Sequence, residues 1–185
     1  MFQQSAWPRP QLSALSVRRR RSMTAEAPLL AIAEISVALV GFSSIVVAIR
    51  GTNPNSWSQQ DRVGLANVFA ASVAALIGSL LPFPLQQLGL AEHQVWSASN
   101  AAFGLLLLSY LVFLLFRQRG TPPRVPFLFW LLVASGFLLG LALLLAAAGL
   151  VVLNGPGLLL VALMFSLLAA LAQLATFLLL STSSR

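Results

Sequence analysis

The chain has 185 residues, of which 58% are hydrophobic and only 8% are charged. Soluble domains carry about 25% charged residues, so this chain could not cover a surface that faces water, and its apolar excess requires lipid. The chain has no cysteine, which excludes disulfides and thiolate-bound metals. The net charge of +7 comes mainly from five Arg within residues 1–22, so it describes one segment and does not indicate a nucleic-acid partner.

Residues 1–22 differ from the rest of the chain in composition. Prolines, scattered serines and the Arg run at residues 18–21 show no helical pattern of hydrophobic residues, which predicts a disordered basic tail. Three interpretations of this tail remain open. Translation could begin at Met23, so that the tail is a mis-assigned start; the tail could be a cytoplasmic arm that contacts anionic lipid; or it could target the chain to an organelle. Residues 23–185 are then a single transmembrane helical domain.

Five apolar segments follow the tail, and each is close to the roughly 20 residues that a helix needs to cross the hydrocarbon of a bilayer. Turn formers separate them, and Pro82 and Pro84 end the second. The sequence therefore predicts an all-α integral membrane protein, a five-helix transmembrane bundle. The alternative is four spans plus a re-entrant hairpin, if the last two segments only dip into the membrane. The expected segments are residues 28–49, 62–81, 95–116, 126–153 and 158–180.

Arginines in short loops set the orientation of a membrane protein, because cytoplasmic loops carry an excess of them. Outside the tail, they occur only in the first and third loops and at the C-terminus, which predicts a cytoplasmic C-terminus and an N-terminus outside. The basic tail contradicts this orientation, and the conflict disappears if translation starts at Met23. The arginines concerned are Arg50, Arg62, Arg117, Arg119, Arg124 and Arg185.

Glu34 interrupts the first apolar segment about six residues after its start, roughly 9 Å into the hydrocarbon at about 1.5 Å per residue. An acid at mid-span costs about 2.5 kcal/mol or more on insertion scales, so its side chain is expected to face protein or water. The helical repeat places Ala38, Gly41 and Ile45 on the side that carries Glu34. Because small residues let another helix approach closely, the sequence predicts that Glu34 points into the bundle.

Small and polar residues share a face in the other segments too, which predicts a compact bundle with a few polar groups inside. One interpretation is hydrogen bonding between helices, which would fix their register. The other is a proton or cation site at Glu34. The predicted intramembrane polar cluster comprises Glu34, Asn67, Asn100 and Gln173. The glycines expected at helix contacts are Gly41, Gly78, Gly104, Gly136 and Gly140.

The sequence contains no zinc-protease, serine-hydrolase, P-loop or dinucleotide-binding motif. His93 beside Glu92 is an incomplete metal site and is interpreted as a solvated pair at the interface. We therefore expect no catalytic, cofactor-binding or metal-binding residues, and no enzyme activity. The aromatic residues near the ends of the segments resemble the belt that anchors membrane proteins at the interface. These residues are Trp57, Trp96, Trp130 and, with a less regular position, Tyr110.

The run AEISVALVGFSSIVVAIR is followed by W-S-x-x-D-R and later by LP…LGL…VW-x-x-S-x-A. These motifs cover about residues 31–117 and resemble those of a group of small, uncharacterised multi-pass proteins of bacterial inner membranes. The resemblance implies a bacterial inner-membrane protein but no activity, because none is known for the group. The similarity begins after Met23, which fits a translation start there.

These observations predict a non-enzymatic protein of the inner (plasma) membrane. We expect it to act by association, either as a homo-oligomer or with another membrane protein. The alternative is a small channel or proton-coupled transporter in which Glu34 is the titrating group. Glu34→Gln would be tolerated in the first case and would abolish flux in the second.

Overall fold

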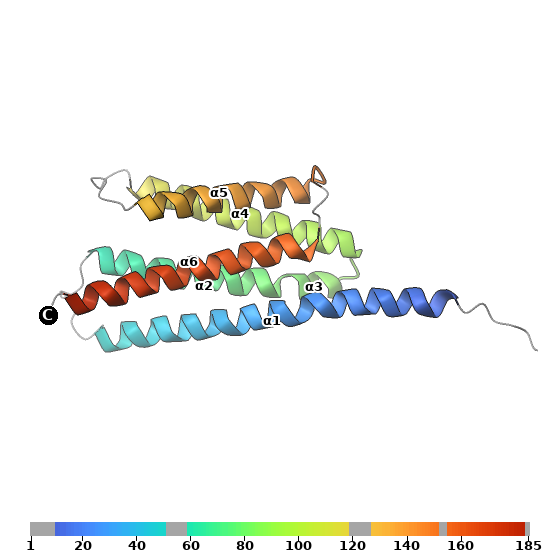
Figure 1. The fold of residues 1–185 in the computed structure, drawn as a ribbon, viewed down its shortest axis with the longest axis horizontal. Helices are drawn as coiled ribbons and strands as arrows, with labels where there is room; N and C mark the ends of the chain where they lie inside the picture. The colour runs from blue at the N-terminus through green and yellow to red at the C-terminus, as the bar shows by residue number, and fades with distance from the viewer. Residues whose placement is uncertain (1–9, 51–58, 119–126, 152–154, 184–185) are drawn as a thin grey trace, which may run out of the picture.

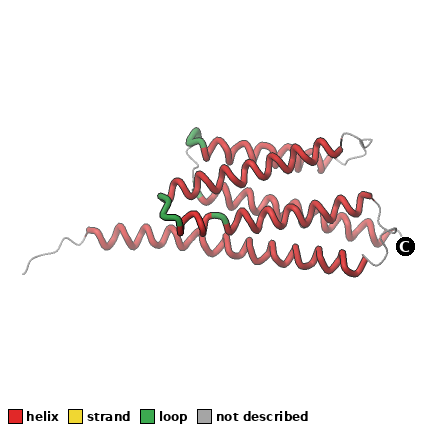
Figure 2. The backbone as a smooth tube through the Cα atoms, turned by 180° about the vertical axis from the view of Figure 1, so that it is seen from behind, coloured by secondary structure: helices red, strands yellow, loops and turns green. Residues whose placement is uncertain are grey.

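The computed structural model describes residues 10–50, 59–118, 127–151 and 155–183, with side chains for 25–48, 63–116, 130–151 and 155–175. This part of the chain is entirely helical, with no strand, as the sequence predicts (Figure 2). The helices are α1 (Pro10–Arg50), α2 (Gln59–Leu80), α3 (Pro82–Gln87), α4 (Glu92–Gln118), α5 (Phe127–Ala147) and α6 (Pro156–Ser183).

Five helical stretches within the described residues are long and apolar enough to cross a membrane. The last two, on α5 and α6, contain 18 and 20 residues. Each is therefore long enough to cross alone, so the five-span prediction is confirmed and the hairpin alternative is not needed. The stretches are Ala25–Ala48, Val63–Gln87, Glu92–Phe116, Trp130–Ala147 and Pro156–Ala175.

The helices form two groups that lie side by side (Figure 1). Helix α2 packs against α1 on one side and α6 on the other, and α4 packs against α5 as a hairpin. The hairpin contacts α2 and α6 much less extensively than α2 contacts α1 and α6, or than α4 contacts α5. With five crossings, the two ends of the helical chain lie at opposite ends of the bundle (Figure 1).

Helix ends follow the proline and glycine positions. Pro82 begins the short helix α3 directly after α2, close to the expected end of the second segment. Gly149 has a φ of 74° and closes α5, because its N–H binds the Ala146 carbonyl while that of Leu150 binds Leu145. The expected segment 126–153 was therefore too long, since this glycine cap ends the helix at Ala147.

Helix α1 starts earlier than the sequence suggested. It is already helical at Pro10 and passes through residues 10–22, where a disordered tail was expected. Proline fits the first helical position because its missing N–H would have no partner there. The four Arg and two Leu of this stretch favour helix. The N-terminal part of α1 extends beyond the rest of the bundle (Figure 1).

Helices α1 and α2, which pack against each other, both bury serines. Ser36 and Ser43 of α1 are buried, and so are Ser72 and Ser79 of α2. Each hydroxyl donates a hydrogen bond to a carbonyl one turn earlier in its own helix, at 2.7–2.9 Å. The hydroxyls are thereby satisfied without help from the other helix, so these positions act as small residues that let the two backbones approach.

Candidate functional site

Glu34 lies on the outer surface of α1 and is exposed. The buried face of this helix carries Leu29, Ile32, Ser36 and Leu39, which lie on the opposite side. This corrects the expectation that Glu34 points into the bundle. The physical reason is that the serine face combines small residues with large aliphatic ones, which allows close van der Waals packing against α2 and leaves the costly carboxyl group outside.

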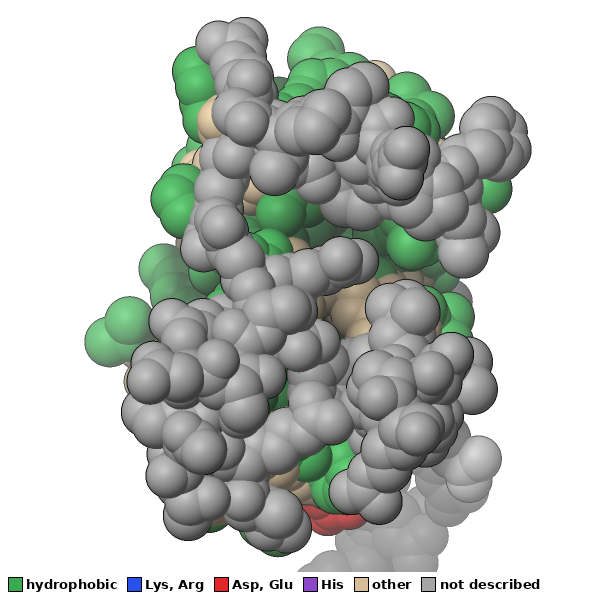
Figure 3. All heavy atoms as spheres, turned by 90° about the vertical axis from the view of Figure 1, so that its left-hand side faces the viewer, with side chains coloured by type: hydrophobic (Ala, Val, Ile, Leu, Met, Phe, Trp, Pro, Cys, Tyr) green, Lys and Arg blue, Asp and Glu red, His purple; other side chains and the backbone are tan. Residues whose placement is uncertain are grey.

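The exposed face of α1 is continuous around Glu34. Ala38, Gly41, Ile45 and Ala48 are all exposed, and no atom of another helix lies within 4 Å of the place where a Cβ of Gly41 would stand. Figure 3 shows acidic atoms at the lower edge of the molecule, which is the α1 side. We call the residues Glu34, Ala38, Gly41 and Ile45 the α1 outer stripe.

The carboxyl group lies deep in the membrane span. Glu34 follows Ala25 by nine residues and precedes Ala48 by fourteen. At about 1.5 Å per residue, it is roughly 14 Å from one end of the span and 21 Å from the other. Glu34 therefore lies well inside this apolar stretch rather than at one of its ends.

The other four glycines expected at helix contacts lie where helices meet. A Cβ on Gly104 of α4 would stand 3.1 Å from the carbonyl oxygen of Gly140 on α5. A Cβ on Gly78 would lie within 3 Å of Phe103 and Leu163, and one on Gly136 within 3.2 Å of Leu111. These positions therefore need glycine for packing, whereas Gly41 has open space beside it.

Asn100 is completely buried on α4, and neither atom of its amide has a hydrogen-bond partner in the described structure. The indole N–H of Trp96 and the hydroxyl of Ser99 are buried and unpaired as well. Ser99 and Asn100 follow Trp96 by three and four residues, which is one turn further along the same side of α4. Nearby, Ser97 donates a hydrogen bond of 2.7 Å to the carbonyl of Ala147 on α5. This end of α4 thus concentrates polar groups inside the bundle.

A cavity of about 460 Å³ lies between the two helix groups, lined by residues of α2, α4, α5 and α6. Its lining is apolar except for Tyr110, Ser166 and Gln173. The Tyr110 hydroxyl and the Gln173 Oε1 atom are buried without a hydrogen-bond partner. The sequence predicts a belt position for Tyr110, and its spacing gives no sign of a cavity, because residues of four helices form the wall.

The four residues of the predicted polar cluster do not form one site. Glu34 lies outside the bundle, Asn100 is buried towards the N-terminal end of α4, and Gln173 lies beside the cavity on α6. Asn67 is half-buried on α2 and does not line that cavity. The helical repeat shows on which face of its own helix each residue lies, but it cannot show which faces of different helices pack together.

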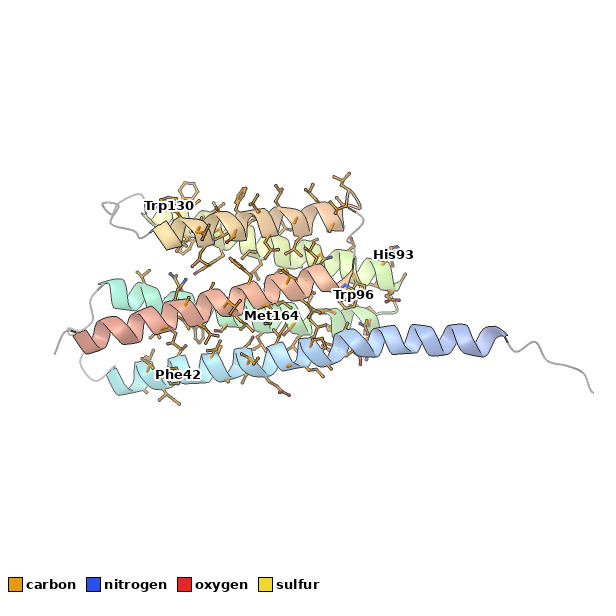
Figure 4. The ribbon with its side chains drawn as sticks, in the orientation of Figure 1. Phe42, His93, Trp96, Trp130 and Met164 are labelled. Carbon is orange, nitrogen blue, oxygen red and sulfur yellow. The ribbon has the colours of Figure 1, made fainter. Side chains whose placement is uncertain are left out.

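The predicted aromatic belt residues also differ in burial. Trp96 is buried inside the bundle with 5% of its surface exposed, so it is not an interfacial anchor. Trp130 is exposed on α5, and the two positions can be compared in Figure 4. Trp57 lies outside the described residues.

Glu92 and His93 are exposed in the first turn of α4, and no group of three potential metal ligands occurs among the residues that the structure describes.

Comparisons with protein-family models, curated proteins and solved structures found no match to this chain. The class of the protein therefore follows from its helices. Five of them, in the described ranges, have the length and apolar composition to cross a bilayer. The chain is a multi-pass membrane protein.

Proposed function

We propose that the chain is a non-enzymatic protein of a bacterial inner membrane that acts by association with a second copy of itself. The observation that supports this is the exposed carboxyl group of Glu34 near mid-span. On insertion scales a charged acid there costs about 2.5–3.5 kcal/mol, and such residues almost always face a bundle interior or a water-filled cavity. In a single chain Glu34 faces neither, so a partner that covers it would lower the free energy.

A second copy suits this face because of symmetry. Two copies inserted with the same orientation are related by an axis along the membrane normal, so the two Glu34 side chains meet at the same depth. A carboxyl group that carries its proton can then donate a hydrogen bond to an oxygen of the other instead of facing hydrocarbon. Ala38 and Gly41 lie on the same side of α1 and are small enough for two helices to approach closely.

The proposed orientation has the N-terminus outside and the C-terminus in the cytoplasm for a chain that starts at Met23. The Arg distribution in the first and third loops supports it. The resemblance to small bacterial inner-membrane proteins supports the choice of membrane. Under this orientation, the α1 outer stripe of both copies crosses the bilayer in the same direction, as a symmetric dimer requires.

The alternative of a channel or proton-coupled transporter has less support. Glu34 lies outside the bundle, so a path through the interior of one chain would not pass it. A path between two copies would pass Glu34. The variant Glu34→Gln therefore distinguishes a dimer that conducts protons from one that does not. Proton flux into vesicles, measured with a trapped pH-sensitive dye, should be absent from both the native chain and the variant. Flux that the variant abolishes would favour the transporter.

Cysteine cross-linking tests the dimer directly, because the native chain has no cysteine to interfere. Ala38→Cys in membranes should form a disulfide-linked dimer after mild oxidation, since the two α1 helices face each other. Leu138→Cys is the matched control: Leu138 is 67% exposed at the middle of α5, so it reports random encounters. Equal cross-linking at both positions would contradict the α1 interface.

A further inference from the structure

We propose that the cavity between the two helix groups binds a membrane-soluble amphiphile: an apolar molecule that carries a neutral hydroxyl group. Its volume of about 460 Å³ lies within the roughly 300–1,000 Å³ that is typical of ligand sites. No α1 residue lines it, so this inference does not depend on the proposed dimer.

The cavity is open to the surface that faces lipid. Phe69 and Ile77 of α2, which line it, are 45% and 50% exposed. On the inner side its wall is made of buried residues, with Phe103 and Leu107 of α4 at 2% and 7% exposure and Ser166 of α6 at 6%. A molecule dissolved in the bilayer can therefore enter from the side, without passing through water.

The polarity of the cavity changes along the membrane normal as that of an amphiphile does. Tyr110 precedes Gln118, the last residue of α4, by eight residues, and Gln173 precedes Ser183, the last residue of α6, by ten. They lie about 12 Å and 15 Å from these ends, which are on the same side of the membrane (Figure 1). Phe103 lies about 20 Å below the end of α4, near mid-span. A bound molecule would thus keep its polar group towards this end of the helices and its apolar part near the centre.

The two unpaired groups define the chemistry of the polar end. The Tyr110 hydroxyl can donate a hydrogen bond, and the Gln173 Oε1 atom accepts one. A ligand hydroxyl can accept a hydrogen bond from the Tyr110 hydroxyl or donate one to Gln173 Oε1, so either group can recognise it. No charged side chain lines the cavity. A phosphate or ammonium headgroup would therefore lose its hydration without gaining an ion pair, which favours a neutral alcohol over a phospholipid.

Photolabelling in lipid nanodiscs tests the site. The probes are a long-chain alcohol with a diazirine in its chain and the corresponding alkane, which has no hydroxyl. The alcohol should label α4 and α6 peptides that line the cavity more strongly than the alkane does. Tyr110→Phe removes one hydrogen bond and keeps the ring, so it should weaken alcohol labelling about two- to tenfold and leave alkane labelling unchanged.

A second pair of variants tests the space itself. Ala74→Leu adds volume within the lining, whereas Ala102→Leu adds the same volume on the exposed face of α4. The first should abolish labelling by both probes and the second should not. Labelling that is equal for alcohol and alkane and insensitive to Tyr110→Phe would mean that bulk lipid chains occupy a surface groove. That result, or unchanged labelling in Ala74→Leu, would overturn the proposal.

Discussion

At the scale of single residues, the molecule contains two kinds of polar group in apolar surroundings. Glu34 is exposed at a depth where lipid would surround it, and Asn100 is buried among helices without a partner. Both carry a cost, because neither water nor protein satisfies them in the single chain. A second copy can satisfy Glu34, but Asn100 is inaccessible to any partner. Replacing Glu34 should therefore weaken the dimer, whereas replacing Asn100 should stabilise the fold.

Replacing Glu34 should weaken the dimer in proportion to the hydrogen bonding that is lost. Interhelical hydrogen bonds in membranes are worth about 0.6 kcal/mol on average and up to about 1.7, so Glu34→Leu should raise the dimer dissociation constant about 3- to 20-fold. Glu34→Gln keeps hydrogen-bonding atoms and should stay close to the native value. Energy transfer between labelled copies at increasing lipid dilution measures both constants. A Glu34→Leu dimer as tight as the native one would exclude a role of the carboxyl group in association.

Replacing Asn100 should stabilise the fold. An unpaired buried amide costs about 1–3 kcal/mol, and Asn100→Leu substitutes an apolar side chain of similar shape, so the free energy of unfolding should rise by about 1 kcal/mol or more. Reversible unfolding in bicelles measures it, with Asn67→Leu at a half-buried position as the control. A lower stability in Asn100→Leu would instead show that a bound water molecule satisfies the amide.

At the scale of elements, small residues decide which helix faces meet, and they do so in two chemical forms. The contact of α1 with α2 uses serines whose hydroxyls bind their own helix. The contact of α4 with α5 uses Gly104 and Gly140, whose backbones touch. Both forms bring the helices close enough for dispersion contacts, which are the main attraction between helices in lipid.

A methyl group added at Gly104 should therefore push α4 away from α5, whereas one added at Gly41 of α1 should have no effect on packing. Gly104→Ala places a Cβ 3.1 Å from a backbone oxygen and from the Leu143 Cβ, neither of which can move easily. Overpacking of this kind costs about 1–3 kcal/mol of unfolding free energy. Gly41→Ala is the matched control, since nothing lies within 4 Å of the added Cβ. Equal stabilities of the two variants would contradict the close α4–α5 contact.

At the scale of the whole molecule, limited contact between the two helix groups leaves the cavity in place. The groups are joined by loops and by a few contacts of the α4–α5 hairpin with α2 and α6. Tyr110 and Gln173 come from different groups, so their approach depends on how the hairpin docks. The alcohol and the dimer partner would use different faces of the molecule. Helix α1 forms the proposed dimer face, and none of its residues lines the cavity.

The sequence by itself determined the class and the number of spans. The thickness of the hydrocarbon requires about 20 apolar residues per crossing, and the turn-forming residues divide the chain into five such lengths. Glycines at positions 78, 104, 136 and 140 were also assigned to helix contacts from their neighbours on the same face. These features are local, so they can be read along one segment at a time.

Only the tertiary structure decided which face of each helix is inside. In water, the polar face of a helix marks its outside, but lipid is as apolar as the core, so this signal is lost in a membrane. On α1 the Ser36 face and the Gly41 face both carry small residues, and docking against α2 selected the serine face. That choice left Glu34 on the outside, where its carboxyl group is free to meet a partner.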